Sequence, residues 1–596
     1  MNVEKWKGVL TWERVICRLF ASWCTFAAIL AFRDFGFWEI GYGQELGLGL
    51  VIGGILLLFA VYTVIAVLLP AYSTDSWFLM LAATVAACRW IMTYDADADR
   101  QLLFSLAVFA VYALFAIYFI RQNQTLLQRW QPGNRTLIVL ATLCSLAACV
   151  VLSVIGCLRY LTFSTPNFDF GLFVNMFHNM KETGLPLVTS ERNELLSHFA
   201  VHISPIYYLL LPFYWLFPSP LTLQIGQAVA LALGVIPAVL LAKHFGLSGK
   251  ACTLVAVIYA FFPVLTTGCF YDLHENCFLP LFLLLTFYFF EKKKYPLMYL
   301  SALCVLAVKE DAAIYLLIFA VYVLLSRREY LHGGILAAAS VGYFLLATHL
   351  IETVGDGVLS NRFDNLIVDE ESGLFGIVKL ALVNPGYLLT QLFTTKDGGW
   401  EKISYFLQLL LPVAGLPFCT KKASRWLLIT PILINLLSYY PYLYHTGFQY
   451  HFATVAFLIY AMIQNLPELK APARQNLLAL GAAACCCIYL GVVMPKLAMY
   501  RDRWEDNRET YEQMEEILDA LPEDASLNVS TFLLAHVADR DEVYEIGYHK
   551  NAPDVDFVVL DLRYGGDENC ERAYLRQGYT VYAEHPGMLL ILQKGE

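Results

Sequence analysis

Charged side chains are scarce in this chain of 596 residues, where Asp, Glu, Lys and Arg make up 15% of the composition. Soluble domains normally carry about 25% charged residues, whereas 58% of this chain is hydrophobic and its mean hydropathy is +0.57. Apolar runs of membrane-spanning length recur from near residue 15 to near residue 493, and most lack the polar face of a soluble core helix. The chain is therefore expected to be an all-α polytopic membrane protein.

The usual signatures of soluble enzymes are also missing. The sequence has no phosphate-binding glycine-rich loop, no Gly-x-Ser-x-Gly elbow and no His-Glu-x-x-His motif. No Cys-x-x-Cys pair occurs, which argues against a zinc ribbon. Most of the 15 cysteines lie inside apolar runs, where they are expected to act as small apolar side chains. Cys269 and Cys277 bracket a short polar loop, so a disulfide between them stays open.

About fifteen apolar segments are expected to span the membrane, since a bilayer core needs roughly 20 apolar residues per helix. No small-residue cleavage site follows the first segment, which therefore predicts an anchor and not a cleavable signal peptide. The expected spans are 15–32, 46–70, 76–94, 101–120, 136–158, 221–242, 251–269, 278–291, 296–308, 312–326, 331–351, 402–419, 426–440, 452–466 and 477–494.

Basic residues predict the orientation, because Lys and Arg concentrate in short cytoplasmic loops. Alternate loops are rich in them and the opposite loops, such as 94–100, 271–277 and 442–451, are nearly free of them. This pattern places the N-terminus in the cytoplasm and the C-terminal segment outside it. The residues that carry the bias are Arg121, Arg129, Arg135, Lys243, Lys250, Lys292, Lys293, Lys294, Arg327, Arg328, Lys421, Lys422, Arg425, Lys470 and Arg474.

Three regions are expected. Residues 1–130 form a four-helix transmembrane addition, residues 131–495 form the transmembrane core, and residues 496–596 form a small extracytoplasmic α/β domain. Two long outer segments interrupt the core, at 159–220 and 352–401. Within them, the proline-bounded stretch 206–217 and the Asn-Pro-Gly sequence at 384–386 predict elements at the membrane interface.

The tail carries the negative charge of the chain. Residues 496–596 contain 22 acidic and 10 basic side chains, whereas the whole chain has a net charge of −10. An acidic domain argues against binding to nucleic acid. Its sequence predicts a charged helix over 500–521, strands over 555–562 and 588–592, and a helix over 570–577.

Polar residues gather on the expected outer side of the membrane. Asp169 lies just beyond the fifth span, where a carboxylate could act as a general base or hold a divalent cation, or simply cap the next helix. Asp272, His274 and Glu275 offer three potential ligands within one turn, and a solvated loop is the alternative.

Lys309, Glu310 and Asp311 interrupt an apolar stretch with three consecutive charges. A plain turn would be made more cheaply by Gly, Asn or Ser, and a cation beside two acids is suited to a phosphate. Histidines complete the set of candidates. His202 is a candidate catalytic residue, and His198 and His451 are candidate substrate-binding residues, with a helix-start role as the alternative for His202 and His451.

Several stretches together resemble a bacterial family of predicted membrane proteins, domain of unknown function 2079. The likeness covers residues from about 136 to the end and rests on Phe-Asp-Phe-Gly-Leu-Phe at 168–173, His-Phe-Ala-Val-His-Ile-Ser-Pro at 198–205, Leu-Pro-Phe-Tyr-Trp-Leu-Phe-Pro-Ser-Pro-Leu at 211–221, Tyr-Asp-Leu-His-Glu at 271–275, Lys-Glu-Asp at 309–311, Tyr-His at 450–451, His536, Arg540 and Asp-Phe-Val-Val-Leu-Asp at 556–561.

That family is distantly similar to the GT-C glycosyltransferases, which take sugars from polyprenyl-phosphate carriers. The resemblance implies a GT-C-like core in which a span leads into a long outer loop with a catalytic acid and an interfacial helix. It makes Asp169 the candidate base or metal ligand. Phe170 stands where the commonest GT-C pattern has a second acid, which leaves the metal open.

These expectations combine into a multi-pass glycosyltransferase of the cell membrane and envelope, acting with membrane lipid and a polyprenyl-phosphate-linked sugar on the outer face. A divalent cation is a candidate cofactor, with Asp169, His274 and Glu275 as candidate ligands. The acceptor stays unidentified, and nucleic acid is excluded as a partner. The alternatives are a transporter or flippase of lipid-linked or small anionic substrates, and a non-catalytic envelope scaffold. The absence of internal repeats and the one-sided acids favour the enzyme.

Overall fold

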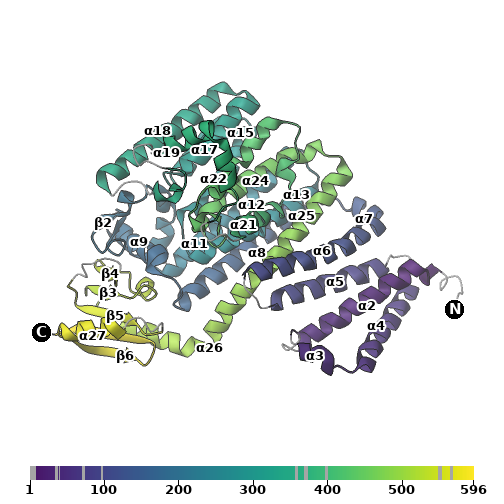
Figure 1. Cartoon of the computed structure of the whole chain (residues 1–596), viewed down its shortest axis with the longest axis horizontal. Coiled ribbons are helices and arrows are strands. Elements are labelled where there is room, and N and C mark those ends of the chain that lie inside the picture. Colours follow the sequence, from purple (N-terminus) through teal and green to yellow (C-terminus); the bar gives the residue numbers. More distant parts are fainter. Residues whose placement is uncertain are drawn as a thin grey trace.

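The computed structural model describes residues 8–33, 38, 40–69, 74–94, 98–355, 360–367, 373–395, 400–547, 554–563 and 568–595, except for a few side chains within them. These residues form a helical bundle with a small β-sheet near the C-terminal end (Figure 1). In this view the N-terminal helices and the C-terminal sheet lie at opposite sides of the molecule.

By length and composition, nine helical segments of the described residues could cross a membrane, and three shorter apolar helices accompany them. The chain is therefore a multi-pass membrane protein, as its composition predicts. The expected number of about fifteen spans is higher because it counts short and broken helices as full crossings. The nine segments are Trp12–Arg33, Leu48–Leu68, Thr74–Thr93, Arg100–Gln122, Asn134–Leu161, Pro220–His244, Gly249–Tyr271, Tyr330–Val354 and Ala471–Asp519.

The N-terminal helices are held together by a buried ion pair. Asp75 begins helix α5 and contacts both Arg14 and Arg18 of helix α2, with Arg18 at 2.8 Å. Charges at membrane depth are costly unless they pair, which explains why these three meet. The elements are α2 (Trp12–Arg33), α3 (Ile40–Glu45), α4 (Leu48–Leu68), α5 (Thr74–Thr93), α6 (Ala98–Gln122) and α7 (Gln124–Arg129), and α6 packs on α25 (Ala471–Val492).

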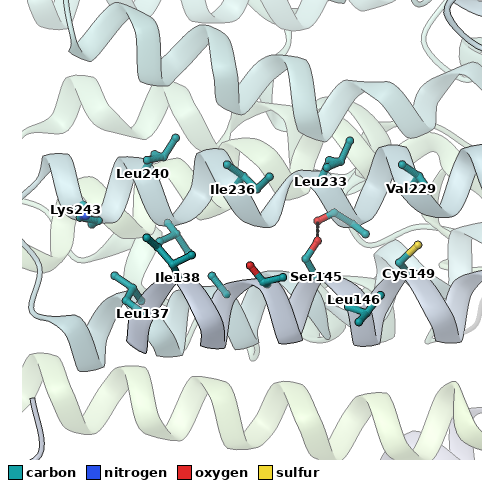
Figure 2. A pocket seen from close by; sticks show the side chains of 14 residues that line it. Leu137, Ile138, Ser145, Leu146, Cys149, Val229, Leu233, Ile236, Leu240 and Lys243 are labelled. Atoms are coloured by element: carbon teal, nitrogen blue, oxygen red, sulfur yellow. Dashed lines mark hydrogen bonds between the residues drawn. The ribbon is translucent and has the colours of Figure 1, made fainter. Parts of the chain in front are cut away.

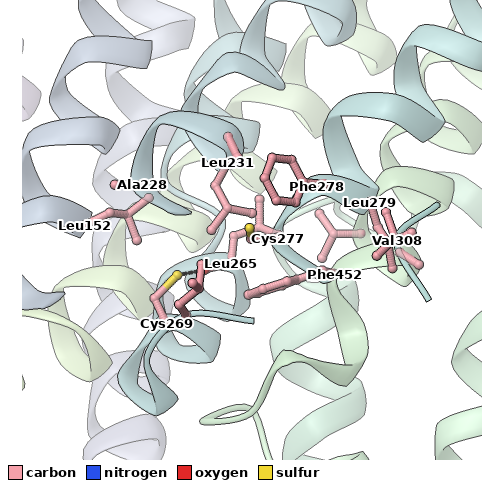
Figure 3. Packing of buried hydrophobic residues seen from close by; sticks show 14 of the residues in the cluster. Leu152, Ala228, Leu231, Leu265, Cys269, Cys277, Phe278, Leu279, Val308 and Phe452 are labelled. Carbon is pink, nitrogen blue, oxygen red and sulfur yellow. Dashed lines mark hydrogen bonds between the residues drawn. The ribbon is translucent and has the colours of Figure 1, made fainter. Parts of the chain in front are cut away.

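The core is densest around helix α24 (Phe452–Asn465), whose residues are all buried. A helix that is apolar all round is stable only inside such a bundle. Figure 3 shows Phe452 beside Leu265 and Cys277 in this core. Helices α12, α14, α15 and α22 contact α24 directly. The other elements of the bundle surround them, and the helices are α8 (Asn134–Leu161), α11 (Pro220–Leu233), α12 (Val235–His244), α13 (Gly249–Ala260), α14 (Pro263–Thr267), α15 (Leu279–Glu291), α16 (Tyr295–Leu306), α17 (Ala312–Tyr322), α18 (Tyr330–Val354), α21 (Glu401–Leu410), α22 (Thr430–Leu437) and α23 (Pro441–Tyr444).

The disulfide alternative for Cys269 and Cys277 is wrong. Both thiols are free and buried in the core. The Cys269 thiol donates a hydrogen bond to the carbonyl oxygen of Leu265 at 3.3 Å (Figure 3). The two cysteines therefore pack as small apolar side chains, like most of the others.

The first long outer segment is a series of short elements. A π-helical turn, Asn167–Gly171, leads into helix α9 (Leu172–Thr183) and the hairpin of β1 (Leu187–Val188) and β2 (Leu196–Ser197). The predicted interfacial stretch forms a 3-10 helix, Pro205–Leu209, followed by α10 (Leu211–Leu216), with several large apolar side chains exposed. The second outer segment contains a 3-10 turn (Ser360–Phe363), α19 (Gly373–Val383) and α20 (Pro385–Gln391).

The tail begins with α26 (Met494–Asp519), which continues α25 out of the bundle (Figure 1). Its five-stranded mixed sheet has the order β4-β3-β5-β7-β6, with β3 parallel to β4 and β5 and the other pairs antiparallel. The predicted strands near 555–562 and 588–592 are confirmed, as are both tail helices. The elements are β3 (Leu527–Val529), β4 (Val543–Glu545), β5 (Phe557–Asp561), α27 (Glu568–Arg576), β6 (Tyr579–His585) and β7 (Leu589–Lys594).

The tail docks directly on the first outer segment. The backbone N–H of Asn167 donates to the Thr531 carbonyl at 2.9 Å. The Asn175 amide donates to two carbonyls of the tail, those of Ala538 at 3.1 Å and Arg540 at 2.8 Å. The π-helical turn that carries Asp169 is therefore clamped between the bundle and the tail.

Candidate functional site

Several of the candidate residues meet in one cavity of about 310 Å³. The cavity lies where the π-helical turn, the hairpin region and the loops at the ends of the core helices converge. These segments are far apart in the sequence, so only the fold brings them together. The lining residues are Asn167, Phe168, Leu172, Phe173, Glu191, Arg192, His198, Val201, His202, His274, Glu275, Lys309, Arg362, Tyr440, Gln449 and Tyr450.

A buried ion pair forms one wall of the cavity. The Nζ atom of Lys309 lies 3.0 Å from Oε1 of Glu275, and the side chains are 4% and 2% exposed. The other carboxylate oxygen accepts a hydrogen bond from the hydroxyl of Tyr207 at 2.7 Å. Burial opposes ionisation of Glu275, but the adjacent ammonium of Lys309 holds its pKa well below the usual range.

His202 forms a second pair on the same wall. Its Nδ1 atom lies 2.9 Å from Oε1 of Glu310, whose other oxygen accepts the backbone N–H of Ile203 at 3.2 Å. Burial and the nearby positive charge of Lys309 lower the pKa of His202 below its ordinary value. The imidazole is therefore neutral at neutral pH and can accept a proton at Nε2.

The pKa of His198 is shifted in the opposite direction. Its Nδ1 atom lies 3.0 Å from Glu191, and burial favours the neutral ring. The carboxylate of Glu191 outweighs burial, so the pKa of His198 is raised. Its Nε2 atom is buried and has no hydrogen-bond partner among the described residues.

Arg362 is the main residue that the sequence did not reveal. Its guanidinium lines the cavity and lies over the rings of Tyr450 and Tyr440, at 5.0 Å and 5.8 Å from their centroids. It makes no ion pair with any side chain in the described ranges. Such a cation is ready to receive an anion. Arg362 is the single Arg of the outer segment 352–401 and belongs to no motif, so nothing in the sequence singled it out.

Asp272 is not among the residues that line the cavity, and its substrate-binding role stays a prediction. Both carboxylate oxygens are bonded to the Arg159 guanidinium, at 2.9 Å and 2.8 Å, and one also accepts from Gln224 at 2.8 Å. The residue has φ 65° and ψ −161°, a conformation that favours glycine. Asp272 is thus a structural anchor that fixes the loop before His274 and Glu275.

Three further candidates, His451, Asp311 and Glu310, also lie outside the lining. His451 is fully buried, and its Nε2 atom lies 2.8 Å from the Val264 carbonyl. Asp311 precedes helix α17 and interacts electrostatically with Lys309, Glu310 and Arg362. Glu310 contacts the cavity only through His202. His274 lines the cavity and packs with its ring near Tyr271 and Phe173.

The side chain of Asp169 lies outside the described part of the structure. Its backbone belongs to the π-helical turn, and its neighbours Asn167 and Phe168 line the cavity. Among the described side chains, no group of three or more His, Cys, Asp or Glu residues is placed to hold a metal ion. Within the described structure, His274 and Glu275 therefore do not form a metal site by themselves.

A separate apolar cavity of about 560 Å³ runs between α8 and helices α11 and α12. Figure 2 shows Lys243 at one end of it and Cys149 at the other. The hydroxyl of Ser145 is satisfied by the Ala232 carbonyl at 2.8 Å. This apolar cavity follows the half of α8 that is distant from Leu161, and it shares no lining residue with the first cavity.

Comparisons with known proteins place the chain in a family. No curated protein matches the sequence. Crystal structures of ArnT from Cupriavidus metallidurans, bound to undecaprenyl phosphate and in the apo state, are similar over 77% and 76% of this chain and 98% and 97% of theirs. Their identities are 11% and 12%, and their TM-scores are 0.43 and 0.47, too low to establish a common fold.

The family match covers the helical core and the tail. Residues 159–590 match the family described as Predicted membrane protein (DUF2079). The match begins in the last turn of the fifth long helix, Asn134–Leu161, and includes every residue that lines the cavity with Arg362. It confirms the resemblance seen in the sequence, and the chain belongs to the DUF2079 family of predicted membrane proteins.

Proposed function

We propose that this chain is a GT-C-type membrane glycosyltransferase that transfers a sugar from a polyprenyl-phosphate-linked donor to an acceptor. The observation that carries the proposal is the convergence of cationic, acidic and imidazole side chains on one cavity beside the turn of Asp169. Donor binding requires an anion site, and glycosyl transfer requires a proton acceptor. The cavity offers both within a multi-pass membrane protein.

Arg362 is the proposed ligand of the donor phosphate. Lys309 already has a carboxylate partner at 3.0 Å, whereas Arg362 lies over two aromatic rings and interacts with Asp311 and Glu310 only electrostatically, without an ion pair among the described contacts. A guanidinium matches phosphate oxygens in a bidentate geometry. Lys309 adds positive potential from the wall, and Glu275 keeps its ammonium in place.

Asp169 or His202 is the proposed base. In the reaction, an acceptor oxygen bonds to the anomeric carbon, and the bond from that carbon to the phosphate oxygen breaks with its electron pair on the phosphate. The acceptor proton moves to the base. His202 is neutral at neutral pH and is oriented through Nδ1 by Glu310, as a general base should be. Asp169 is assigned by the family resemblance and by its turn next to the cavity.

The position of the charges favours transfer chemistry over transport. Coupled transporters place their ionisable residues near the midplane, commonly on broken helices of internal repeats. Here the charged residues of the cavity lie in loops and at helix ends. The outer location of this end of the bundle remains a prediction from the basic loops.

The test uses purified full-length protein in proteoliposomes with a radiolabelled polyprenyl-phosphate sugar. Donor binding and sugar transfer are measured separately for Asp169→Asn, Arg362→Gln and His202→Gln. We expect Asp169→Asn to bind donor but to lose transfer by at least about 100-fold, a typical contribution of a general base. Arg362→Gln should weaken donor binding at least tenfold.

Asp506→Asn is the matched control, because Asp506 is an exposed carboxylate on α26 outside the cavity. It should leave both measurements unchanged. Full transfer by Asp169→Asn and His202→Gln would refute the assignment of the base. Scrambling or uptake of the lipid-linked sugar without any transfer would favour a flippase.

A further inference from the structure

A second polar cavity lies between helix α9, the end of α26 and the tail. Its volume is about 760 Å³, within the range of small-molecule sites. Among the described residues it is lined by Glu182 of α9 and six acidic residues of the segment 519–542. The acidic cavity shares no lining residue with the cavity that contains Arg362.

The two cationic residues of this acidic cavity, Lys181 and Arg540, are outnumbered by its seven carboxylates, although Arg540 interacts electrostatically with Asp539 and Glu523. The ammonium of Lys181 lies 2.8 Å from its neighbour Glu182. The Arg540 guanidinium donates to backbone carbonyls, including those of Val537 at 2.8 Å and Pro522 at 3.0 Å. Its hydrogen bonds serve the fold of the tail. The remaining carboxylates therefore create a negative potential in the cavity.

A buried histidine supplies an independent sign of a ligand. His536 lies in the lining of the acidic cavity, yet its side chain is only 1% exposed. Its ring stacks between Tyr160 and Phe163, with centroids 4.1 Å and 3.8 Å away. Its Nδ1 atom lies 2.8 Å from Glu515. With both faces and this edge covered, the edge that carries Nε2 is left for the cavity.

That Nε2 atom is buried and has no hydrogen-bond partner among the described residues. A buried polar atom without a partner is costly, so it calls for an explanation. When Nδ1–H donates to the Glu515 carboxylate, Nε2 is an acceptor. Asp519 interacts electrostatically with both His536 and Asp539, and both carboxylates line the same cavity as this acceptor.

We propose that the acidic cavity binds an organic cation with at least two ammonium groups, one of which donates to Nε2 of His536 while another is held by Asp519 and Asp539. Carboxylate oxygens and the Nε2 acceptor of His536 accept hydrogen bonds without donating them, so they are complementary to ammonium groups, which only donate. No three carboxylates or imidazoles of the described residues are arranged around a common point for a metal ion. Separated ammonium groups can instead reach the acids one by one.

Spermidine is the probe for this proposal, and the sample is the purified full-length chain in lipid nanodiscs. Equilibrium binding of radiolabelled spermidine is measured at low ionic strength, where surface electrostatics are strongest. We expect saturable binding that is weakened at least tenfold by the double variant Asp519→Asn with Asp539→Asn. Both side chains lie on exposed residues, so the fold should tolerate the change.

Two variants make the test specific. Asp506→Asn removes an exposed charge from α26 outside the cavity and should leave binding unchanged. His536→Phe keeps an aromatic ring between Tyr160 and Phe163 but removes Nε2, and binding should weaken severalfold. Melting temperatures of all variants establish that they are folded.

The proposal is overturned if spermidine does not bind saturably, or if Asp506→Asn and the double variant bind equally. It is also overturned if Ca²⁺ binds at the same acids and spermidine cannot displace it. None of these measurements depends on sugar transfer, so failure here is distinguishable from failure of the proposed function.

Discussion

The ammonium of Lys309 lies 3.0 Å from the carboxylate of Glu275, although the helices α15 and α16 separate the two residues in the sequence. Both side chains are nearly free of solvent contact. Such a pair is stable only as a unit, because removing one partner leaves a buried charge without compensation. The wall of the proposed donor site therefore depends on this contact.

Lys309→Met should destabilise the protein by about 3–5 kcal/mol, the usual cost of breaking a buried ion pair. Replacing both residues, with Glu275→Leu, should cost less than the two single changes together. Thermal unfolding in detergent measures this coupling. Lys379→Met, at an exposed lysine of α19, is the control and should shift stability by less than about 0.5 kcal/mol. Additive effects would show that the two charges do not interact.

His202 and His198 should give opposite pH dependences of stability. The pKa of His202 is lowered in the folded state, so its contribution is complete above the ordinary value of 6.5 and is lost as pH falls below it. The pKa of His198 is raised, so its contribution is complete below 6.5 and is lost as pH rises through the folded value.

The measurement compares wild type with His202→Gln and His198→Gln by thermal unfolding between pH 5 and 8. The stability difference from His202→Gln should shrink toward acid, and that from His198→Gln should shrink toward alkali. Each full unit of pKa shift corresponds to about 1.4 kcal/mol. If the stability differences of both variants changed with pH in the same direction, the opposite pKa shifts of His202 and His198 would be contradicted.

Gly171→Ala should loosen the contact between the tail and the π-helical turn. A Cβ atom at this position would lie 2.8 Å from Oδ1 of Asn167 and 2.9 Å from a methyl group of Leu534. Overpacking of this kind costs about 1–3 kcal/mol. Gly334→Ala is the control, since a Cβ there meets nothing within 4 Å.

Limited proteolysis reports the release of the tail. Faster cleavage within residues 520–547 is expected for Gly171→Ala and not for Gly334→Ala. If the tail docks on this turn only weakly, the two variants will be cleaved at the same rate.

Asp272 provides a test of backbone strain. Asp272→Gly and Asp272→Ala both remove the carboxylate that holds Arg159, so both should be strongly destabilised. The backbone at φ 65° and ψ −161° suits glycine better, so the glycine variant should be about 1–3 kcal/mol more stable than the alanine variant. Equal melting temperatures would show that the loop relaxes without cost.

The tail shows which elements can be predicted from the local sequence pattern and which cannot. Strand β5 is a continuous apolar run that is buried throughout, and α26 is a long charged helix, so both are visible in the sequence. Strands β3 and β4 have only three residues each and derive their stability from parallel pairing with distant segments. Such short segments carry no reliable periodicity of their own.

The sequence by itself determined that the chain is a multi-pass membrane protein, because the hydropathy of a segment depends only on its own residues and not on how the helices pack. It also identified Glu275, Lys309, His198 and His202 as unusual, since charge among apolar residues is conspicuous. Only the tertiary structure decided their partners. It placed Asp272 against Arg159, 113 residues away, and added Arg362 to the cavity, because contacts between segments far apart in the sequence depend on packing, which no local pattern encodes.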